Sequence, residues 1–344
     1  MGAFSVFSFA NDIAVGHIAT LVSAFGLGFL VKQTWGLDTD FRRTIQHYGY
    51  AKRWELLKRP IEDNDEGFDC PYEYLLNIYG RHHFAPFVKA FNEKMKVTDP
   101  EKYNLILDIM DAVHLCLILV DDICDDSPKR KNQTTAHLIY GSSETANRAY
   151  FVLTKVINRA MRERPVLGIE LLKALEQILN GQDISLVWRR DGLEAFALGS
   201  DDRVSAYKNM AQLKTGMLFV LLGRLLNDGG DQLDDLFLRF GWYSQLQNDC
   251  KNVYSGDYAT YKGVVAEDLR NGELSFPIVM GLNDELVGPH IQKAFRSKSE
   301  RDIRQALTHL ESANMKNKCL TAMNEAAQGL DSLVGLWARR EQMA

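Results

Sequence analysis

A series of apolar residues at helical spacing constrains the fold of this 344-residue chain more than any other feature. Within residues 101–122 the large apolar side chains recur every three or four positions, which is the period of an α-helix: Leu105, Ile106, Ile109, Val113, Leu117 and Val120. The same helical spacing of apolar residues is found in segments 143–164, 167–190, 205–226 and 233–254. Segment 72–97 is predicted to form two helices separated near Gly80 and Pro86. The sequence therefore predicts an all-α, single-domain helical bundle.

Composition narrows the classes of function. Hydrophobic residues make up 46% of the chain, enough for a large core, and the net charge of -5 comes without a basic stripe, so no nucleic-acid partner is expected. The five cysteines show no paired spacing, which favours a reducing compartment, and we expect a cytoplasmic protein.

The N-terminal region is predicted to be separate from the main domain. Residues 1–60 are expected to form a helical segment of uncertain role, and residues 61–344 the main α-domain. Residues 13–31 are apolar and nearly long enough to cross a bilayer, but they contain three glycines and no basic residue precedes them. We therefore favour a packed helical hairpin over membrane contact.

The apolar segment 101–122 runs directly into a group of aspartates. Asp121 and Asp125 are four residues apart and share one helix face, with Asp122 beside them. Carboxylates at the negative end of a helix dipole are unfavourable unless cations balance them. The group is either a solvated surface or a site for divalent cations.

A second polar group lies on the predicted helix 233–254. Asn248 and Asn252 are four apart, Asp249 lies between them, and Gln245 precedes them by about one turn. Mg²⁺ prefers oxygen ligands together with substrate phosphates and water. Two such helices facing each other would bind a Mg²⁺–diphosphate.

In their order along the chain, these motifs resemble the trans-isoprenyl diphosphate synthase family. The similarity runs from about residue 72 to 277 and is closest to fungal geranylgeranyl diphosphate synthases and to class I terpene cyclases built on that scaffold, such as fungal humulene synthase. It rests on DDICDDSPKRKNQTTAHLIYG, GQDISLVWR, Lys214-Thr215-Gly216, QLQNDCKNVYS and EDLRNGELSFP.

The resemblance implies an isoprenoid synthase bundle around a central cavity, three Mg²⁺ ions and, as usual in the family, a homodimer. It implies that catalysis depends on a set of metal ligands, namely Asp121, Asp122, Asp125, Asn248, Asp249 and Asn252. The residues expected to bind the prenyl diphosphate substrate are Arg81, His114, Arg130, Lys131, Arg189, Lys214, Thr215 and Gln245.

The chain departs from the family pattern where elongating members hold isopentenyl diphosphate with Gly-Lys-x-x-Arg. Here the stretch Gly80-Arg81-His82-His83-Phe84 replaces the final arginine by Phe84. Losing one charge-assisted phosphate contact costs about 1.5–3 kcal/mol. Arg81 and His114 still match that pocket.

Three further departures alter the charge around the diphosphate. Asn248 replaces an aspartate, Glu273 replaces a lysine, and Ser185 stands where an aspartate is usual. Terpene cyclases commonly carry Asn, Ser and Glu at i, i+4 and i+8. This chain has Asn248, Asn252 and Gly256, so it fits that triad only in part.

These departures lead to the expectation of a Mg²⁺-dependent class I terpene cyclase, a carbon–oxygen lyase that converts farnesyl diphosphate to a sesquiterpene. Aromatic rings at Phe84, Trp188, Phe219 and Trp242 are candidates to line the cavity and stabilise the cation, although each is also explained by ordinary core packing. Two alternatives remain open: a chain-elongating geranylgeranyl diphosphate synthase, and a catalytically inactive partner subunit.

Overall fold

The computed structural model describes residues 70–198 and 202–343, which belong to one compact unit, residues 69–344. Apart from one short hairpin, the described elements are helical, which confirms the all-α prediction. The elements are α4 (Pro71–Tyr79), α5 (Ala85–Phe91), α6 (Met95–Thr98), α7 (Pro100–Asp125), β1 (Lys129–Arg130), β2 (Gln133–Thr134), α8 (Ala136–Tyr140), α9 (Ser142–Glu163), α10 (Pro165–Asp191), α11 (Leu193–Leu198), α12 (Arg203–Ala211), η1 (Gln212–Gly216), α13 (Met217–Leu226), α14 (Asp234–Tyr254), α15 (Gly256–Lys262), α16 (Glu267–Asn271), α17 (Phe276–Leu282), α18 (Gly288–Ser297), α19 (Glu300–Leu310), α20 (Ala313–Ala327) and α21 (Asp331–Met343).

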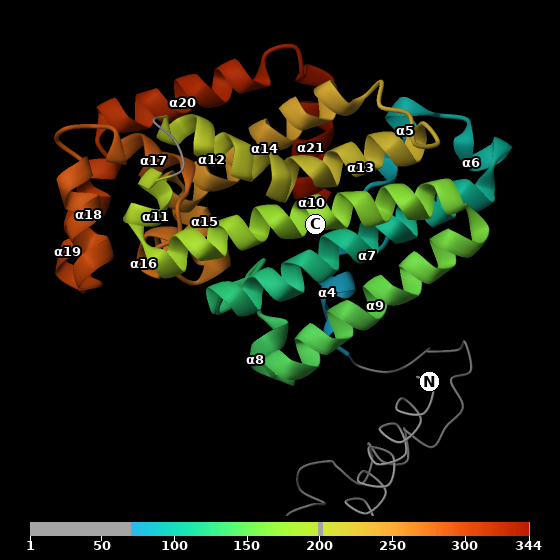
Figure 1. The fold of residues 1–344 in the computed structure, drawn as a ribbon, viewed down its shortest axis with the longest axis horizontal. Coiled ribbons are helices and arrows are strands. Elements are labelled where there is room, and N and C mark those ends of the chain that lie inside the picture. The colour runs from blue at the N-terminus through green and yellow to red at the C-terminus, as the bar shows by residue number, and fades with distance from the viewer. Residues whose placement is uncertain (1–69, 199–201, 344) are drawn as a thin grey trace, which may run out of the picture. The chain divides into compact units, whose positions relative to one another are not determined.

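The long helices pack side by side. Helix α10 contacts α9, η1 and α13, while α7 packs on α9 and α14 packs on α13 and α20 (Figure 1). Helix α7 begins where Asp99 accepts a hydrogen bond from the Lys102 backbone and Pro100 occupies the first turn. It ends at Asp126, whose left-handed φ of 52° stops the helix directly after the aspartates.

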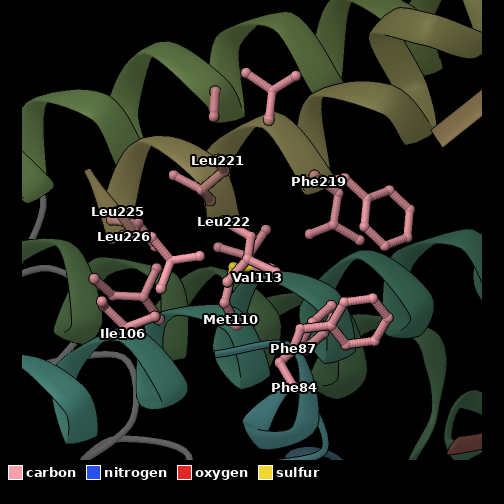
Figure 2. Close-up of a cluster of buried hydrophobic side chains, with 14 of the residues drawn as sticks. Phe84, Phe87, Ile106, Met110, Val113, Phe219, Leu221, Leu222, Leu225 and Leu226 are labelled. Atoms are coloured by element: carbon pink, nitrogen blue, oxygen red, sulfur yellow. The ribbon is translucent and has the colours of Figure 1, made fainter. Parts of the chain in front are cut away.

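The main hydrophobic core lies between α7 and α13. Figure 2 shows Leu222 and Leu225 of α13 against Met110 and Val113 of α7, with Phe84 beside them. These side chains are fully buried. Burying one such side chain stabilises the folded state by about 1.5–3 kcal/mol. The core therefore fixes the position of α7 along its axis, and with it the position of the aspartates at its end.

Two local elements differ from the prediction. The segment 205–226 is not one helix, because the π-helical turn η1 separates α12 from α13. Residues 129–134 form an antiparallel hairpin in which Arg130 pairs with Gln133. Its two turn residues, Lys131 and Asn132, both have positive φ, as in a type I′ turn.

Within the described residues, α7 is the one helix that is long and apolar enough to cross a membrane. Since 61% of its most apolar window is buried inside the protein, it is explained as a core helix. The predictions for residues 1–60, including the apolar segment 13–31, lie outside the described residues.

Candidate active site

The end of α7 places three carboxylates next to basic residues from three other elements. Asp121 Oδ1 lies 3.2 Å from the Lys214 ammonium of η1. Asp125 Oδ1 accepts a 2.9 Å hydrogen bond from Arg189 of α10. Asp122 accepts hydrogen bonds from Arg130 of β1, one of them 3.0 Å from Nε. The predicted aspartates and four-residue spacing are therefore brought together with three of the predicted substrate-binding cations.

Close backbone packing explains how Lys214 reaches Asp121. A Cβ placed on Gly181 of α10 would lie 2.4 Å from the Lys214 backbone nitrogen, and one placed on Gly241 of α14 would lie 2.4 Å from the Gly216 Cα. Glycines on both neighbours therefore let η1 sit between α10 and α14. A π-helical turn widens the helix at this point, a feature often found at functional sites.

The surroundings of Asp121 and Asp125 shift the pKa values of these two carboxyl groups in opposite directions. Burial opposes ionisation of Asp121, but Lys214 and Arg130 outweigh it and lower the Asp121 pKa to about 2. Burial, followed by the charges of Asp121 and Glu273, raises the pKa of Asp125 to about 8. Asp121 is therefore the more readily ionised carboxylate of the pair.

Glu273 adds a carboxylate to the same place. Its Oε1 lies 3.4 Å from the Lys214 ammonium and 3.4 Å from Ser185 Oγ. Asn271, from the preceding α16, donates a 2.8 Å hydrogen bond to the Asp125 carbonyl. The segment 271–273 therefore closes one side of the site, and the Glu273 substitution places negative charge beside Lys214.

On α14, the predicted residues separate into two groups. Asp249 is buried and accepts hydrogen bonds from Tyr207 Oη, the Phe276 backbone and, at 2.8 Å, Gln245 Nε2. Gln245 in turn accepts a 2.5 Å hydrogen bond from Thr215. The structure thus places Asp249, Gln245 and Thr215 in a hydrogen-bonded network that connects α12, η1 and α17 to α14.

The other group on α14 comprises the two asparagines. Asn248 is exposed and accepts a 2.8 Å hydrogen bond from Tyr258 of α15. Asn252 is buried, and its Oδ1 has no hydrogen-bond donor among the described residues. A buried oxygen of this kind costs about 1–3 kcal/mol unless a ligand or water satisfies it.

These donors fit Mg²⁺ bound together with a diphosphate. No group of three or more His, Cys, Asp and Glu side chains in the described ranges is arranged to hold a metal ion unaided. Mg²⁺ is typically held by one or two carboxylates, with substrate phosphates and waters completing its octahedron. Asp121, Asp125 and the unsatisfied Asn252 oxygen provide hard oxygen ligands of that type.

Of the positions that match the isopentenyl diphosphate pocket, Arg81 and Phe84 lie in the turn between α4 and α5, and His114 lies on α7. Arg81 is exposed and donates a 3.0 Å hydrogen bond to Glu73. Phe84 is fully buried, and its ring packs edge-on against His114 at 5.6 Å. His114 also contacts His83 through a 2.9 Å approach of Nδ1 to Nε2. An apolar ring therefore packs against His114 at the position where elongating members of the family carry an arginine.

The four candidate cation-stabilising rings occupy two different clusters. Phe84 and Phe219 lie 6.5 Å apart in the main core and are almost fully buried. Trp188 packs on Phe196, and Trp242 packs on Tyr207 and Phe276, in a second core. The structure does not bring the four rings to one cavity. Lys131 lies 4.1 Å from the ring centroid of Tyr79, which packs against a third hydrophobic cluster.

Two cavities flank the site. One of about 410 Å³ borders Asp125 through its partners Arg189 and Asn271; its other lining residues are Asp183, Leu186, Val187, Arg190 and Lys298. The second, of about 290 Å³, is lined by Tyr74, Asn77, Ile78, Lys131 and Gln133. The first cavity therefore opens next to the contact between Arg189 and Asp125, and the second opens beside the hairpin.

Sequence reasoning missed several residues that build the site. Tyr207 and Tyr258 hold Asp249 and Asn248, and Asn271 holds the end of α7. Asp111 was also missed, although a signal was present, since a carboxylate in the middle of an apolar helix requires a buried partner. The partners of Asp111 are the His82 backbone N–H, which donates a 2.6 Å hydrogen bond to Oδ2, and His83, whose Nδ1 lies 2.9 Å from Oδ1.

A model of the polyprenyl synthetase family matches residues 65–310 of this chain. The chain belongs to the polyprenyl synthetase family. A polyprenyl synthase from Caulobacter crescentus CB15, solved with calcium and isoprenyl diphosphate, superposes on this family member with a TM-score of 0.64. The alignment covers 83% of this chain and 87% of that one at 19% identity, and it supports the isoprenoid synthase fold.

Fungal relatives of this polyprenyl synthetase-family chain are much more similar. Prenyltransferase idtC of Claviceps paspali is 60% identical over 356 residues, 97% of each chain. Prenyltransferase terC of Tolypocladium album is 60% identical over 97% of each chain. Prenyltransferase ltmC of Epichloe festucae var. lolii is 61% identical over 95% of each chain.

These relatives overturn the predicted reaction. Proteins similar over nearly their whole length are named prenyltransferases, so the prediction of a humulene synthase-like cyclase and carbon–oxygen lyase is wrong. The predictions of farnesyl diphosphate as the substrate and of a sesquiterpene as the product are likewise unsupported. The error lay in reading Phe84, Asn248 and Glu273 as the loss of an acceptor site, because a missing arginine is equally compatible with a change of acceptor. The prediction of an enzyme is supported.

Proposed function

We propose that this chain is a Mg²⁺-dependent prenyltransferase that moves the prenyl group of an allylic prenyl diphosphate onto an electron-rich aromatic acceptor. The donor side retains Asp121 and Asp125 with Lys214, Arg189 and Arg130 around them. The observation that carries the proposal is the buried Phe84 ring beneath His114, which gives the acceptor side an apolar, ring-lined floor.

In this proposal the residues around α7 bind and orient the donor. Asp121, Asp125, Asn248 and Asn252 would hold Mg²⁺, which would neutralise the charge of the departing diphosphate. Lys214, Arg189 and Arg130 would exchange their present carboxylate partners for diphosphate oxygens. Rings around the acceptor keep water from the allylic cation, since water would otherwise capture it.

Product analysis tests the proposal. The full-length chain would be incubated with Mg²⁺ and geranyl, farnesyl or geranylgeranyl diphosphate. Each donor would be combined with indole, an indole bearing a phosphorylated side chain, a phenol or isopentenyl diphosphate. Liquid chromatography–mass spectrometry should show a prenylated aromatic product. A longer prenyl diphosphate formed only with isopentenyl diphosphate would replace this proposal by chain elongation, and no product from any pair would reject it.

We further propose that a second copy of the chain covers an exposed apolar stripe on α10. Val166, Ile169, Leu172 and Leu179 are 44–52% exposed and recur at spacings of three, three and seven residues, which places them on one face. Exposed apolar faces of this kind mark interaction sites. Light scattering should report a dimer, and Ile169→Glu with Leu172→Glu should produce monomers; a monomeric native chain would reject the assignment.

A further inference from the structure

Asn248 presents an amide at a predicted metal-ligand position where the family usually carries an aspartate. An aspartate has two equivalent oxygens, so either orientation of its carboxylate presents an oxygen to a cation. An amide has one oxygen and one NH₂ group, and the NH₂ group can only donate hydrogen bonds. Whether Asn248 can bind a metal is therefore decided by the direction in which its amide is turned.

Tyr258 of α15 contacts the oxygen of this amide. Its hydroxyl donates a 2.8 Å hydrogen bond to Asn248 Oδ1 across the junction between α14 and α15. An amide oxygen carries two lone pairs, so one can accept from Tyr258 while the other is left for a cation. The hydrogen bond therefore fixes the position of the oxygen without using up its capacity to bind a metal.

The backbone that carries Tyr258 is held at both ends of α15. Ser255 follows α14 directly and caps α15, because its Oγ accepts a 3.2 Å hydrogen bond from the Tyr258 backbone N–H. At the other end, a Cβ placed on Gly263 would lie 3.2 Å from the Lys129 side chain. Helix α15 also packs on β1, the strand that carries Arg130. Tyr258 is thus presented to Asn248 from a fixed position between α14 and the hairpin.

The two asparagines of α14 differ in how much they need such a partner. Asn252 is buried, so its neighbours restrict the side chain, whereas Asn248 is exposed. On a helix, an exposed asparagine has about two accessible χ1 wells and two amide orientations, which gives about four arrangements. Only one of them places the oxygen where Tyr258 holds it. Fixing that arrangement before the metal binds is therefore worth about fourfold in affinity.

We propose that Tyr258 is a positioning residue for metal binding, and that its hydroxyl turns the Asn248 amide so that Oδ1 faces the Mg²⁺–diphosphate. This rests on the proposed function, in which Asn248 is one of the Mg²⁺ ligands. Tyr258 makes and breaks no covalent bond, and it acts only on the affinity for Mg²⁺–diphosphate. Hydrogen-bond partners of metal ligands typically change metal affinity by about 10–100-fold, and an exposed neutral amide belongs at or below the low end of that range.

A double-mutant cycle separates orientation of the amide from packing of α15. Calorimetry would measure binding of Mg²⁺–pyrophosphate to the full-length wild type, Tyr258→Phe, Asn248→Asp and the double variant. In the wild-type background, Tyr258→Phe should weaken binding about 4- to 10-fold, because the amide is no longer held. In the Asn248→Asp background it should weaken binding no more than about twofold, because either carboxylate oxygen can bind the metal.

Asn248→Ala provides a second background, in which no side-chain oxygen is left to orient. There Tyr258→Phe should leave the affinity unchanged, and this comparison decides the test if circular dichroism shows that the Asn248→Asp double variant is unfolded. Tyr254→Phe is the matched control, because it also removes a tyrosine hydroxyl beside α15. That hydroxyl donates a 3.3 Å hydrogen bond to the Leu310 carbonyl, so its loss should leave Mg²⁺–pyrophosphate affinity unchanged.

Equal weakening by Tyr258→Phe in every background would mean that the hydroxyl acts through packing alone, and it would overturn the proposal. Unchanged affinity of Tyr258→Phe in the wild-type background would overturn it as well. A wild type that binds no Mg²⁺–pyrophosphate would reject the metal site of the proposed function, and this inference with it. Because the calorimetry contains no acceptor, a failure to prenylate aromatic compounds would reject the proposed acceptor and leave the role of Tyr258 standing.

Discussion

Gly181 of α10 lies so close to Lys214 of η1 that a Cβ on the glycine would come within 2.4 Å of the lysine's backbone nitrogen. Because backbone atoms of a packed turn cannot yield as a flexible side chain does, the absence of a side chain at Gly181 is what lets Lys214 reach Asp121 at 3.2 Å. The diphosphate site is therefore built by helix packing as much as by charged residues.

The first prediction concerns that contact. Gly181→Ala should overpack the junction of α10 and η1 and lower the free energy of unfolding by about 1–3 kcal/mol, as measured by urea denaturation. Gly335→Ala is the matched control, because a Cβ there meets nothing within 4 Å. Equal stability of the two variants would show that η1 moves aside without cost.

The second prediction concerns Lys214. Its ammonium is shared by Asp121 and Glu273, and we expect it to bind diphosphate. Lys214→Ala should weaken binding of Mg²⁺–pyrophosphate about 10- to 100-fold in calorimetry, the loss of one charge-assisted contact. Lys208→Ala removes an exposed lysine above Trp242 and should leave binding unchanged. Wild-type binding should disappear with EDTA.

The third prediction distinguishes two neighbouring residues of α14. Asp249→Ala leaves Tyr207, Gln245 and the Phe276 amide without an acceptor, and each unsatisfied buried donor costs about 1–3 kcal/mol. Asn248→Ala alters an exposed side chain and should change stability by at most about 0.5 kcal/mol, while it weakens Mg²⁺–pyrophosphate binding. The reverse pattern would make Asp249 the ligand and Asn248 the structural residue.

The fourth prediction concerns pH. Asp125 has a pKa raised to about 8, so its protonated form favours the folded state; that contribution is complete below about pH 4 and is lost as the pH rises through 8. Binding of Mg²⁺–pyrophosphate must remove this proton, so affinity should increase with pH up to about 8. Calorimetry in buffers of different ionisation enthalpy should count nearly one proton released below that pH. Release of none would contradict the assignment of Asp125 as a ligand.

Helix positions were predictable because their signals are local. The apolar period defines α7, α9, α10 and α14 to within a few residues of the bounds observed. The hairpin was not predictable in this way, because its turn residues, Lys131 and Asn132, lack the glycine that usually marks a type I′ turn. The π-helical turn at Lys214 depends on packing against two glycines distant in sequence.

The functional error had a different origin. Spacing placed Asp121, Asp125 and Asn252 in the predicted set of metal ligands, but it could not show that Asp249 turns toward Tyr207. Residues adjacent on a helix point about 100° apart, and which of them faces the core is decided by tertiary packing. Phe84 was recognised as a departure, yet a missing arginine does not reveal whether an acceptor has been lost or exchanged.

The contacts of Asp121 with Lys214 and of Asp125 with Arg189 have a consequence for the order in which metal and diphosphate bind. Magnesium that arrives alone must compete with cations already tethered to the protein, whereas a diphosphate draws those cations away and brings ligands of its own. Occupancy by metal should therefore follow the supply of prenyl donor, and fluctuations in free magnesium should have little effect on the resting enzyme.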